Sequence, residues 1–233
     1  MNIEKISTMA RKVLPPPIFS WVRSAGTAVL APFLFCLRTG HFRSAWLNKA
    51  VDGKGAPLPW YTYPMVEFLS NKDFKGRRIL EWGAGQSTLW WAARAAQVTS
   101  FESDPVWYEK IKKISPPNCS IFLTSDDLQN YRQHIGNEKY DLVVIDGLDR
   151  FKCAVESMSL LSGDGGIVLD DSEGYWGKEG EYPILNLYRE NGFQRIDFFG
   201  YAAGVIQPHC TSLFFKSACF LSAGVENPKR MAI

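Results

Sequence analysis

Residues 77–88 read Arg-Arg-Ile-Leu-Glu-Trp-Gly-Ala-Gly-Gln-Ser-Thr, and this stretch decides the fold. An apolar segment, which predicts a strand, runs into the acid Glu81 and then into Gly83-Ala84-Gly85. The polar residues that follow begin a segment of helical character. A strand, a glycine turn and a helix in this order form the first unit of a doubly wound α/β sheet. Glycines at such a turn let the backbone approach a ligand that side chains would exclude.

A second acid stands one strand–helix–strand unit later. Glu102 closes the apolar segment 98–101, and it follows Glu81 by 21 residues. A carboxylate at this place is positioned to accept hydrogen bonds from both hydroxyls of a ribose. The glycine turn and Glu102 together therefore predict a cofactor of the adenosine type.

The remainder of the chain alternates strands with helices. The predicted strands cover 78–82, 98–102, 120–124, 141–145, 166–169, 193–199 and 211–215, and the predicted helices cover 65–70, 87–96, 105–114, 128–135, 151–161 and 182–190. The last two strands are joined by a glycine-containing loop too short for a helical crossover, so they should pair antiparallel. We expect an α/β protein: a Rossmann-like doubly wound sheet, mostly parallel with a terminal antiparallel strand, plus an N-terminal helical extension.

Acidic residues recur where the predicted strands end. Ligands of open α/β sheets bind outside the carboxyl ends of the strands. Buried strands need no carboxylate at that place, whereas a binding cleft can use one. Five successive strands end in an acid: Glu81, Glu102, Asp126 with Asp127, Asp146, and Asp170 with Asp171.

Size and charge restrict the class of protein. The 233 residues suffice for one large core, and the net charge of +2 argues against a dedicated nucleic-acid partner. Seven Lys/Arg and one acid, Glu4, lie in residues 1–50, whereas the rest of the chain is acidic overall. The five cysteines show no metal-binding spacing and an odd count, which favours reduced thiols and a cytoplasmic location.

Three segments are predicted: a basic, apolar N-terminal extension and linker over 1–58, the α/β domain over 59–216, and a weakly structured tail over 217–233. In the extension, apolar residues between positions 18 and 37 recur on one helical face. The uncharged part, 24–37, is shorter than the roughly 20 residues that cross a bilayer. This helix could pack on the body or on a partner subunit, lie against a membrane surface, or insert into the membrane. If it packs on a partner subunit, that partner could be a second copy of the chain, which would make a homo-oligomer.

The glycines and the ordered acids resemble those of class I S-adenosylmethionine-dependent methyltransferases over residues 65–216. Glu81-x-Gly83-x-Gly85 resembles the first motif, Glu102 the ribose-binding acid, and Asp126 or Asp127 the acid that holds the adenine amino group. The resemblance implies a cofactor site built from Glu81, Gly83, Gly85, Ser87, Thr88, Glu102, Asp126, Asp127 and Asp146.

Two further features refine the resemblance. The segment 59–64, Pro-Trp-Tyr-Thr-Tyr-Pro, and the string Asp170-Asp171-Ser172-Glu173 are similar to a group of bacterial methyltransferase-like proteins that has no settled substrate. Thr88 stands where dinucleotide-binding folds have a third glycine for close packing of helix on strand. That residue argues against a nicotinamide cofactor.

Acids at neighbouring strand ends suggest how the acceptor could be activated. An oxygen nucleophile needs a base or a metal to remove its proton. Asp146 and Asp171 are candidate catalytic residues, and Asp146, Asp170 and Asp171 together could hold Mg²⁺. Asp146 could instead contact the cofactor or cap a helix. His41 could enter the cleft as a base or anchor a loop, and His209 is a candidate substrate contact.

Three aromatic residues of the linker, Trp60, Tyr61 and Tyr63, form either a lid beside the substrate or a packing clamp. The resemblance and the acids together predict methyl transfer from S-adenosylmethionine to a small-molecule or glycan acceptor, at a hydroxyl oxygen. Three alternatives remain: an aminopropyl transferase, an NAD(P) oxidoreductase, and a non-catalytic scaffold attached to a membrane or partner by the N-terminal helix.

Overall fold

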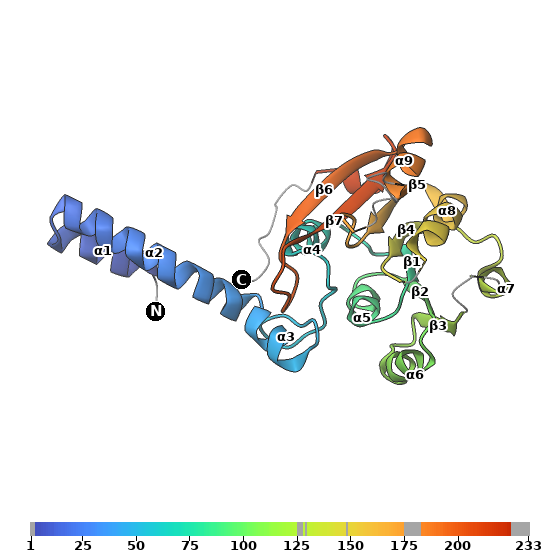
Figure 1. Cartoon of the computed structure of the whole chain (residues 1–233), viewed down its shortest axis with the longest axis horizontal. Coiled ribbons are helices and arrows are strands. Elements are labelled where there is room, and N and C mark those ends of the chain that lie inside the picture. Colours follow the sequence, from blue (N-terminus) through green and yellow to red (C-terminus); the bar gives the residue numbers. More distant parts are fainter. Residues whose placement is uncertain (1–2, 125–127, 129, 148, 175–182, 225–233) are drawn as a thin grey trace.

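The computed structural model describes residues 3–124, 128, 130–147, 149–174 and 183–224. Seven strands of this part form one sheet in the order β3-β2-β1-β4-β5-β7-β6 (Figure 1). Their bounds are β1 Arg78–Trp82, β2 Gln97–Glu102, β3 Cys119–Leu123, β4 Tyr140–Ile145, β5 Leu161–Leu169, β6 Gln194–Gly200 and β7 His209–Phe215. The first five strands are parallel, whereas β7 runs antiparallel to both β5 and β6. The predicted fold class is confirmed.

Helices cover both faces of the sheet, as the alternation of side chains along the strands requires. On one face Ile79 and Val144 pack beneath α4 (Tyr63–Ser70) and α5 (Gln86–Ala92). On the other face Leu80 and Val143 pack beneath the helices α7 (Tyr131–Ile135), α8 (Arg150–Leu160) and α9 (Pro183–Glu190). The helix α6 (Pro105–Ile114) covers β2 and β3 at the edge. Since β1 and β4 are buried from both sides, their carboxyl ends are held rigidly.

The boundaries of the predicted segments shift in two places. Ala50 and Leu58, assigned to the extension, are buried in the main core beside α4. Cys219 and Leu221 are buried too, and 220–222 form the short helix η2 (Phe220–Ser222), so the expected loose tail does not begin at 217. In both places apolar side chains leave water by packing into the core. Residues 225–233 lie outside the described residues.

The N-terminal extension consists of α1 (Ile3–Val13), α2 (Pro16–Arg38) and α3 (His41–Leu47). The helix α2 projects from the body, and none of its residues is buried (Figure 1). It is long and apolar enough to cross a membrane, judged by length and composition. Near its C-terminal end, Phe35 contacts Tyr63 and Phe33 contacts Phe42. Apart from these contacts α2 is therefore not docked on its own body, and docking on a partner subunit or a membrane stays a prediction.

Candidate functional site

The turn after β1 brings two strand ends into close backbone contact. Gly83 has φ +108°, and a Cβ there would lie 3.1 Å from the carbonyl carbon of Asp146. A Cβ on Gly147 would lie 2.9 Å from the carbonyl oxygen of Trp82. Gly83 and Gly147 are thus required because β1 and β4 touch there, and Gly83 is fixed by this packing before any ligand is considered.

Gly85 is different, because no protein atom crowds it. A Cβ at this position would have Ser87 Oγ and Trp107 Nε1 as its nearest neighbours, each at 4.0 Å. Its φ of −175° is open to any residue. The absence of a side chain at Gly85 therefore leaves backbone facing open space, as the sequence predicts for a turn that a ligand approaches.

Glu102 at the end of β2 faces the same turn. Its Oε2 accepts a hydrogen bond from the backbone N–H of Ala84 at 3.0 Å. Its Oε1 accepts from the backbone N–H groups of Ser103 and Asp104, each at 2.9 Å. Trp107 of α6 closes this corner by donating its indole N–H to the carbonyl oxygen of Ala84 at 2.6 Å. The carboxylate is fixed in orientation and retains acceptor capacity.

A cleft of about 470 Å³ opens between these elements at the carboxyl ends of β1, β2 and β4. Its volume is within the range of small-molecule and cofactor sites. Five of the predicted cofactor residues line it: Gly83, Gly85, Ser87, Glu102 and Asp146. Aromatic walls come from Trp60, Trp82, Phe101 and Trp107.

Two predicted cofactor residues lie beneath the cleft instead of lining it. Thr88 Oγ1 accepts a hydrogen bond from the backbone N–H of Gly85 at 3.0 Å, which holds the turn in place. Glu81 is almost fully buried, and its Oε2 accepts from Ser100 Oγ at 2.8 Å. Burial raises the pKa of Glu81 to about 7, an effect that hydrogen bonds from Thr88, Ser100 and Ser87 oppose. Both residues support the turn from below.

Asp126 and Asp127, the candidates for the adenine contact, lie outside the described residues. The described residues Thr124 and Leu128 on either side of them line the cleft. The contact of Asp126 or Asp127 with adenine therefore stays a prediction.

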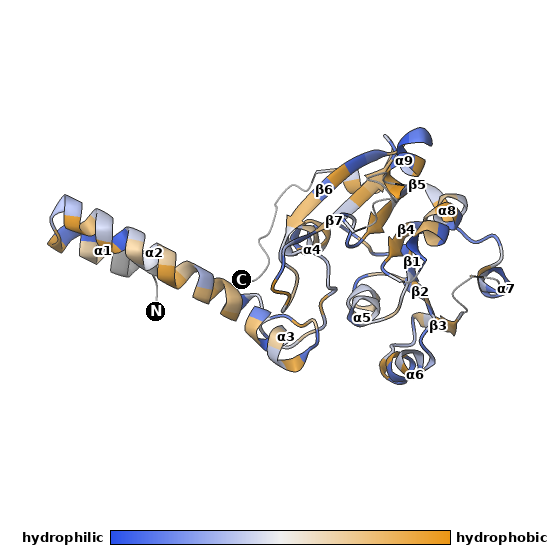
Figure 2. Cartoon of the chain, in the orientation of Figure 1, coloured by the Kyte–Doolittle hydropathy of each residue, from blue (hydrophilic) through white to orange (hydrophobic). Residues whose placement is uncertain are grey.

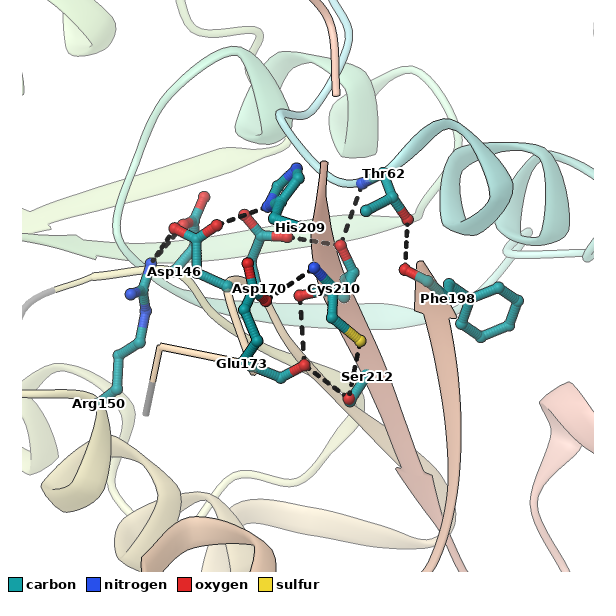
Figure 3. Close-up of polar contacts among 12 residues, drawn as sticks. Thr62, Asp146, Arg150, Asp170, Glu173, Phe198, His209, Cys210 and Ser212 are labelled. Carbon is teal, nitrogen blue, oxygen red and sulfur yellow. Dashed lines mark hydrogen bonds and ion pairs between the residues drawn. The ribbon is translucent and has the colours of Figure 1, made fainter. Parts of the chain in front are cut away.

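Asp146, at the end of β4, is the predicted catalytic acid that lines the cleft. Its Oδ1 accepts a hydrogen bond from the guanidinium of Arg150 at 3.1 Å (Figure 3). Loss of solvation raises the pKa of Asp146 to about 6, although Arg150 acts in the opposite direction. A carboxylate with a pKa near 6 can take up a proton close to neutral pH.

Behind Asp146, a second pair continues the network. The Arg150 guanidinium lies 3.6 Å from Asp171 Oδ2, and Asp171 Oδ1 lies 2.5 Å from His209 Nδ1. The hydrogen bond with His209 lowers the pKa of Asp171. His209 begins β7, so the antiparallel strand brings a side chain from the end of the chain to the acids of β4 and β5. Asp171 and His209 are not among the residues that line the cleft in the described part of the chain.

The predicted Mg²⁺ ligands are not grouped as expected. Asp170, Asp171 and His209 offer ligand atoms within 4.8 Å of one another, whereas Asp146 is paired with Arg150. Asp170 also accepts a hydrogen bond from Thr211 Oγ1 at 2.6 Å. Burial raises the pKa of Asp170 well above the usual range, and the negative charges of Asp146 and Asp171 raise it further. Mg²⁺ prefers oxygen ligands, whereas His209 offers a nitrogen. The guanidinium of Arg150 already supplies a positive charge to Asp146 and Asp171. These residues do not fit Mg²⁺, and we derive no step through a metal.

The structure does not bring His41 to the cleft. Its Nδ1 accepts a hydrogen bond from the backbone N–H of Gly204 at 3.3 Å and lies 3.4 Å from the hydroxyl of Tyr63. Burial lowers the pKa of His41. Because these contacts join the start of α3 to the loop between β6 and β7, His41 anchors the extension on the body.

The three aromatic residues of the linker do not share one role: one lies at the cleft and two pack in the interior or against the extension. Trp60 lines the cleft and donates its indole N–H to the carbonyl oxygen of Ala203 at 2.9 Å. Tyr61 is fully buried and accepts a hydrogen bond from the indole of Trp91 at 3.2 Å, while Tyr63 packs against the extension. Trp60 is thus placed for a substrate wall, and the two tyrosines form a packing clamp.

Asn48, Lys49 and Trp107 are among the cleft residues that sequence reasoning missed. Asn48 and Lys49 reach the rim directly after α3, and Trp107 lies in the first turn of α6. The signal for Trp107 was present, because Asp104 caps α6 through the backbone N–H groups of Val106 and Trp107 and so fixes that turn beside Glu102. No local pattern marked Asn48 and Lys49, since they depend on how the extension packs.

The strand order, with β7 antiparallel between β5 and β6, is that of the Rossmann-like methyltransferase fold. No family model matches the sequence, and no curated protein matches it.

Three solved structures are similar to part of this chain at low sequence identity. Fibrillarin from Aeropyrum pernix, in complex with S-adenosyl-L-methionine, is 14% identical, with a TM-score of 0.49 over 62% of this chain and 67% of that chain. Precorrin-6y C5,15-methyltransferase from Geobacter metallireducens is also 14% identical, with a TM-score of 0.49 over 66% and 87%. Spermidine synthase from Thermotoga maritima is 15% identical, with a TM-score of 0.47 over 68% and 61%.

Proposed function

We propose that the protein transfers a methyl group from S-adenosylmethionine to an acceptor hydroxyl. One observation carries this proposal: the open backbone of Gly85 and the fixed carboxylate of Glu102 face the same cleft, joined through Ala84. A nucleoside with an extended amino-acid tail needs both, since the tail runs along bare backbone while the ribose hydroxyls donate to a carboxylate.

In this proposal different cleft residues bind different parts of the cofactor. Glu102 accepts hydrogen bonds from the ribose, and the aromatic walls Phe101 and Trp107 give the base an apolar surface. Asp146 lines the cleft beside the Gly83 turn, where a carboxylate favours a positively charged sulfur. The bound cofactor supplies an activated methyl group on its sulfonium.

Asp146 is also the proton acceptor in this proposal. A hydroxyl becomes a better nucleophile as its proton moves to a base in the transition state. Asp146 lines the cleft, and its pKa of about 6 leaves it mostly ionised and still basic at neutral pH. Arg150 holds its carboxylate in one orientation. A small molecule or a glycan is the acceptor class we favour, with Trp60 as the wall on which a ring would stack.

Methyl transfer is tested by incubating the protein with methyl-labelled S-adenosylmethionine and a panel of sugars, glycans and phenols. The proposal predicts release of S-adenosylhomocysteine together with label on an acceptor oxygen. Decarboxylated S-adenosylmethionine and NADH are run in parallel. Transfer of an aminopropyl group would favour the first alternative, and hydride transfer the second. Absence of binding to all three cofactors would favour the scaffold.

A further inference from the structure

Exposed apolar side chains lie at the base of α2, where the extension meets the body. Phe33 of α2 contacts Phe42 of α3 at a ring distance of 5.7 Å. On α3, Trp46 is 90% exposed and Leu47 is 55% exposed. Large apolar side chains this exposed, gathered on one element, mark an interaction site.

The loop between β6 and β7 extends this surface. A Cβ on Gly204 would lie 2.5 Å from the backbone nitrogen of Ala45, so the loop lies directly against α3. Tyr201 and Ile206, close to Gly204 in the chain, are 48% and 86% exposed. We call the exposed residues Phe33, Leu37, Phe42, Trp46, Leu47, Tyr201 and Ile206 the base patch.

The helix α2 continues the apolar surface away from the body. Figure 2 shows apolar residues along this helix, and none of them is buried. Trp21 and Val29 are 74% and 70% exposed. At a rise of 1.5 Å per residue, its 23 residues extend over about 34 Å, comparable with the roughly 30 Å hydrocarbon core of a bilayer.

Charge restricts what can cover this surface. Residues 5–51 contain no Asp or Glu, and their basic residues are Lys5, Arg11, Lys12, Arg23, Arg38, Arg43 and Lys49. Pairing with the same segment of a second copy would bring these positive charges together without a counter-charge. A surface of anionic lipid headgroups supplies that counter-charge, and its interior accepts the apolar side chains.

We propose that α2 and the base patch dock this protein on an anionic lipid bilayer. Arg38 follows Leu37 and Arg43 follows Phe42 in the chain, so two basic residues adjoin the patch and can meet headgroup phosphates, while Trp46 and Tyr201 supply the aromatic residues that favour the interface. Asn48 and Lys49, which follow α3 directly, line the rim of the cleft. Docking therefore holds the mouth of the cleft close to the headgroups. This proposal stands independently of the reaction proposed above.

Vesicle flotation of the full-length chain tests the docking. We expect the protein to float with phosphatidylcholine vesicles that contain phosphatidylglycerol and to float less with phosphatidylcholine alone. The double variant Trp46→Ser/Leu47→Ser should lower the partition coefficient about tenfold or more, since both apolar side chains leave the interface. Arg38→Gln/Arg43→Gln should have an effect of similar size on anionic vesicles only, because each basic residue contributes through the anionic headgroups.

Matched controls separate docking from damage to the fold. The double variant Ile114→Ser/Leu123→Ser removes apolar side chains that are 54% and 45% exposed away from the base patch, and it should float like the wild type. Intact mass shows whether residues 1–38 are retained, and thermal unfolding shows whether each variant is folded. The proposal is overturned if the intact full-length chain stays in the bottom fraction. It is also overturned if folded patch variants float unchanged, or if the patch instead mediates a stable oligomer without vesicle binding.

Discussion

The carboxylate of Glu102 accepts a hydrogen bond from the backbone N–H of Ala84 at 3.0 Å, which joins the end of β2 to the turn after β1. This hydrogen bond holds the negative charge of Glu102 beside Gly85, whose backbone faces the cleft. Both parts of the proposed cofactor site are therefore joined directly. Substitutions at these positions should affect ligand affinity more than they affect the fold.

Replacement of Glu102 tests the ribose contact. Glu102→Ala should weaken binding of S-adenosylhomocysteine by roughly tenfold to a hundredfold, because hydrogen bonds to a charged group contribute roughly 1.5–3 kcal/mol. Isothermal titration calorimetry measures the change. Glu138→Ala removes a half-exposed acid far from the cleft and should leave the affinity unchanged. Equal affinities for wild type and Glu102→Ala would remove Glu102 from the site.

A methyl group at Gly85 tests whether a ligand lies against that backbone. The φ of Gly85 carries no strain and the nearest protein atoms are 4.0 Å from a Cβ, so Gly85→Ala should change the free energy of unfolding by less than about 1 kcal/mol. Affinity for S-adenosylhomocysteine should nevertheless fall at least about tenfold, since even one misplaced methyl group in a close-packed contact is costly. Gly163→Ala, at another uncrowded glycine, is the matched control and should bind normally. Normal binding by Gly85→Ala would contradict the proposed path of the ligand.

The acid limb of the pH–rate profile tests Asp146. If Asp146 must be ionised to accept a proton, kcat should rise with pH through about 6 and then level off. Asp171→Asn removes a negative charge that raises the pKa of Asp146, so the limb should move to lower pH. Asp146→Asn should remove the limb and lower kcat by roughly a hundredfold or more. A limb unchanged in Asp171→Asn would show that another group titrates.

Chelation tests the metal separately. The residues at the strand ends do not fit Mg²⁺, and Arg150 already supplies a positive charge beside Asp146 and Asp171. Turnover should therefore be unchanged in EDTA, measured before and after dialysis against the chelator. Loss of activity in EDTA, followed by recovery when Mg²⁺ is added, would instead support Asp146, Asp170 and Asp171 as Mg²⁺ ligands.

Glu81 should make the fold less stable as pH rises from 4.5 through about 7. Its pKa is near 7 in the fold against an ordinary value of 4.5, so the stabilisation is fully present below 4.5 and is lost as pH rises through 7. The shift corresponds to about 3 kcal/mol at 1.36 kcal/mol per unit. Glu81→Gln should flatten the decline in Tm between pH 5 and pH 8. The exposed Glu109→Gln should retain the decline, and an identical decline in both variants would contradict the assignment to Glu81.

Much of the body could be predicted from sequence because its signals are local. The turn at 83–85, the spacing from Glu81 to Glu102 and the antiparallel pair at the end of the sheet are set by short stretches of chain, and the structure has them. The helix at 128–135 was predicted too long, since only Tyr131–Ile135 is helical within the described residues.

What could not be predicted depends on contacts between distant segments. The contacts of Asp171 with Arg150 and with His209 need the sheet to bring β4, β5 and β7 together. His41 was a candidate for the cleft because histidine is a common base, yet Gly204, 163 residues later in the chain, holds it at the loop. The same packing of extension on loop placed Asn48 and Lys49 at the cleft, where no pattern indicated them.

Equilibrium binding of S-adenosylmethionine to the full-length protein, by calorimetry, is the most direct test of the central claim. The account predicts saturable binding at one site per chain, weakened in Glu102→Ala and Gly85→Ala, with no saturable binding of NADH. No heat of binding for S-adenosylmethionine, or an affinity that neither substitution changes, would contradict it.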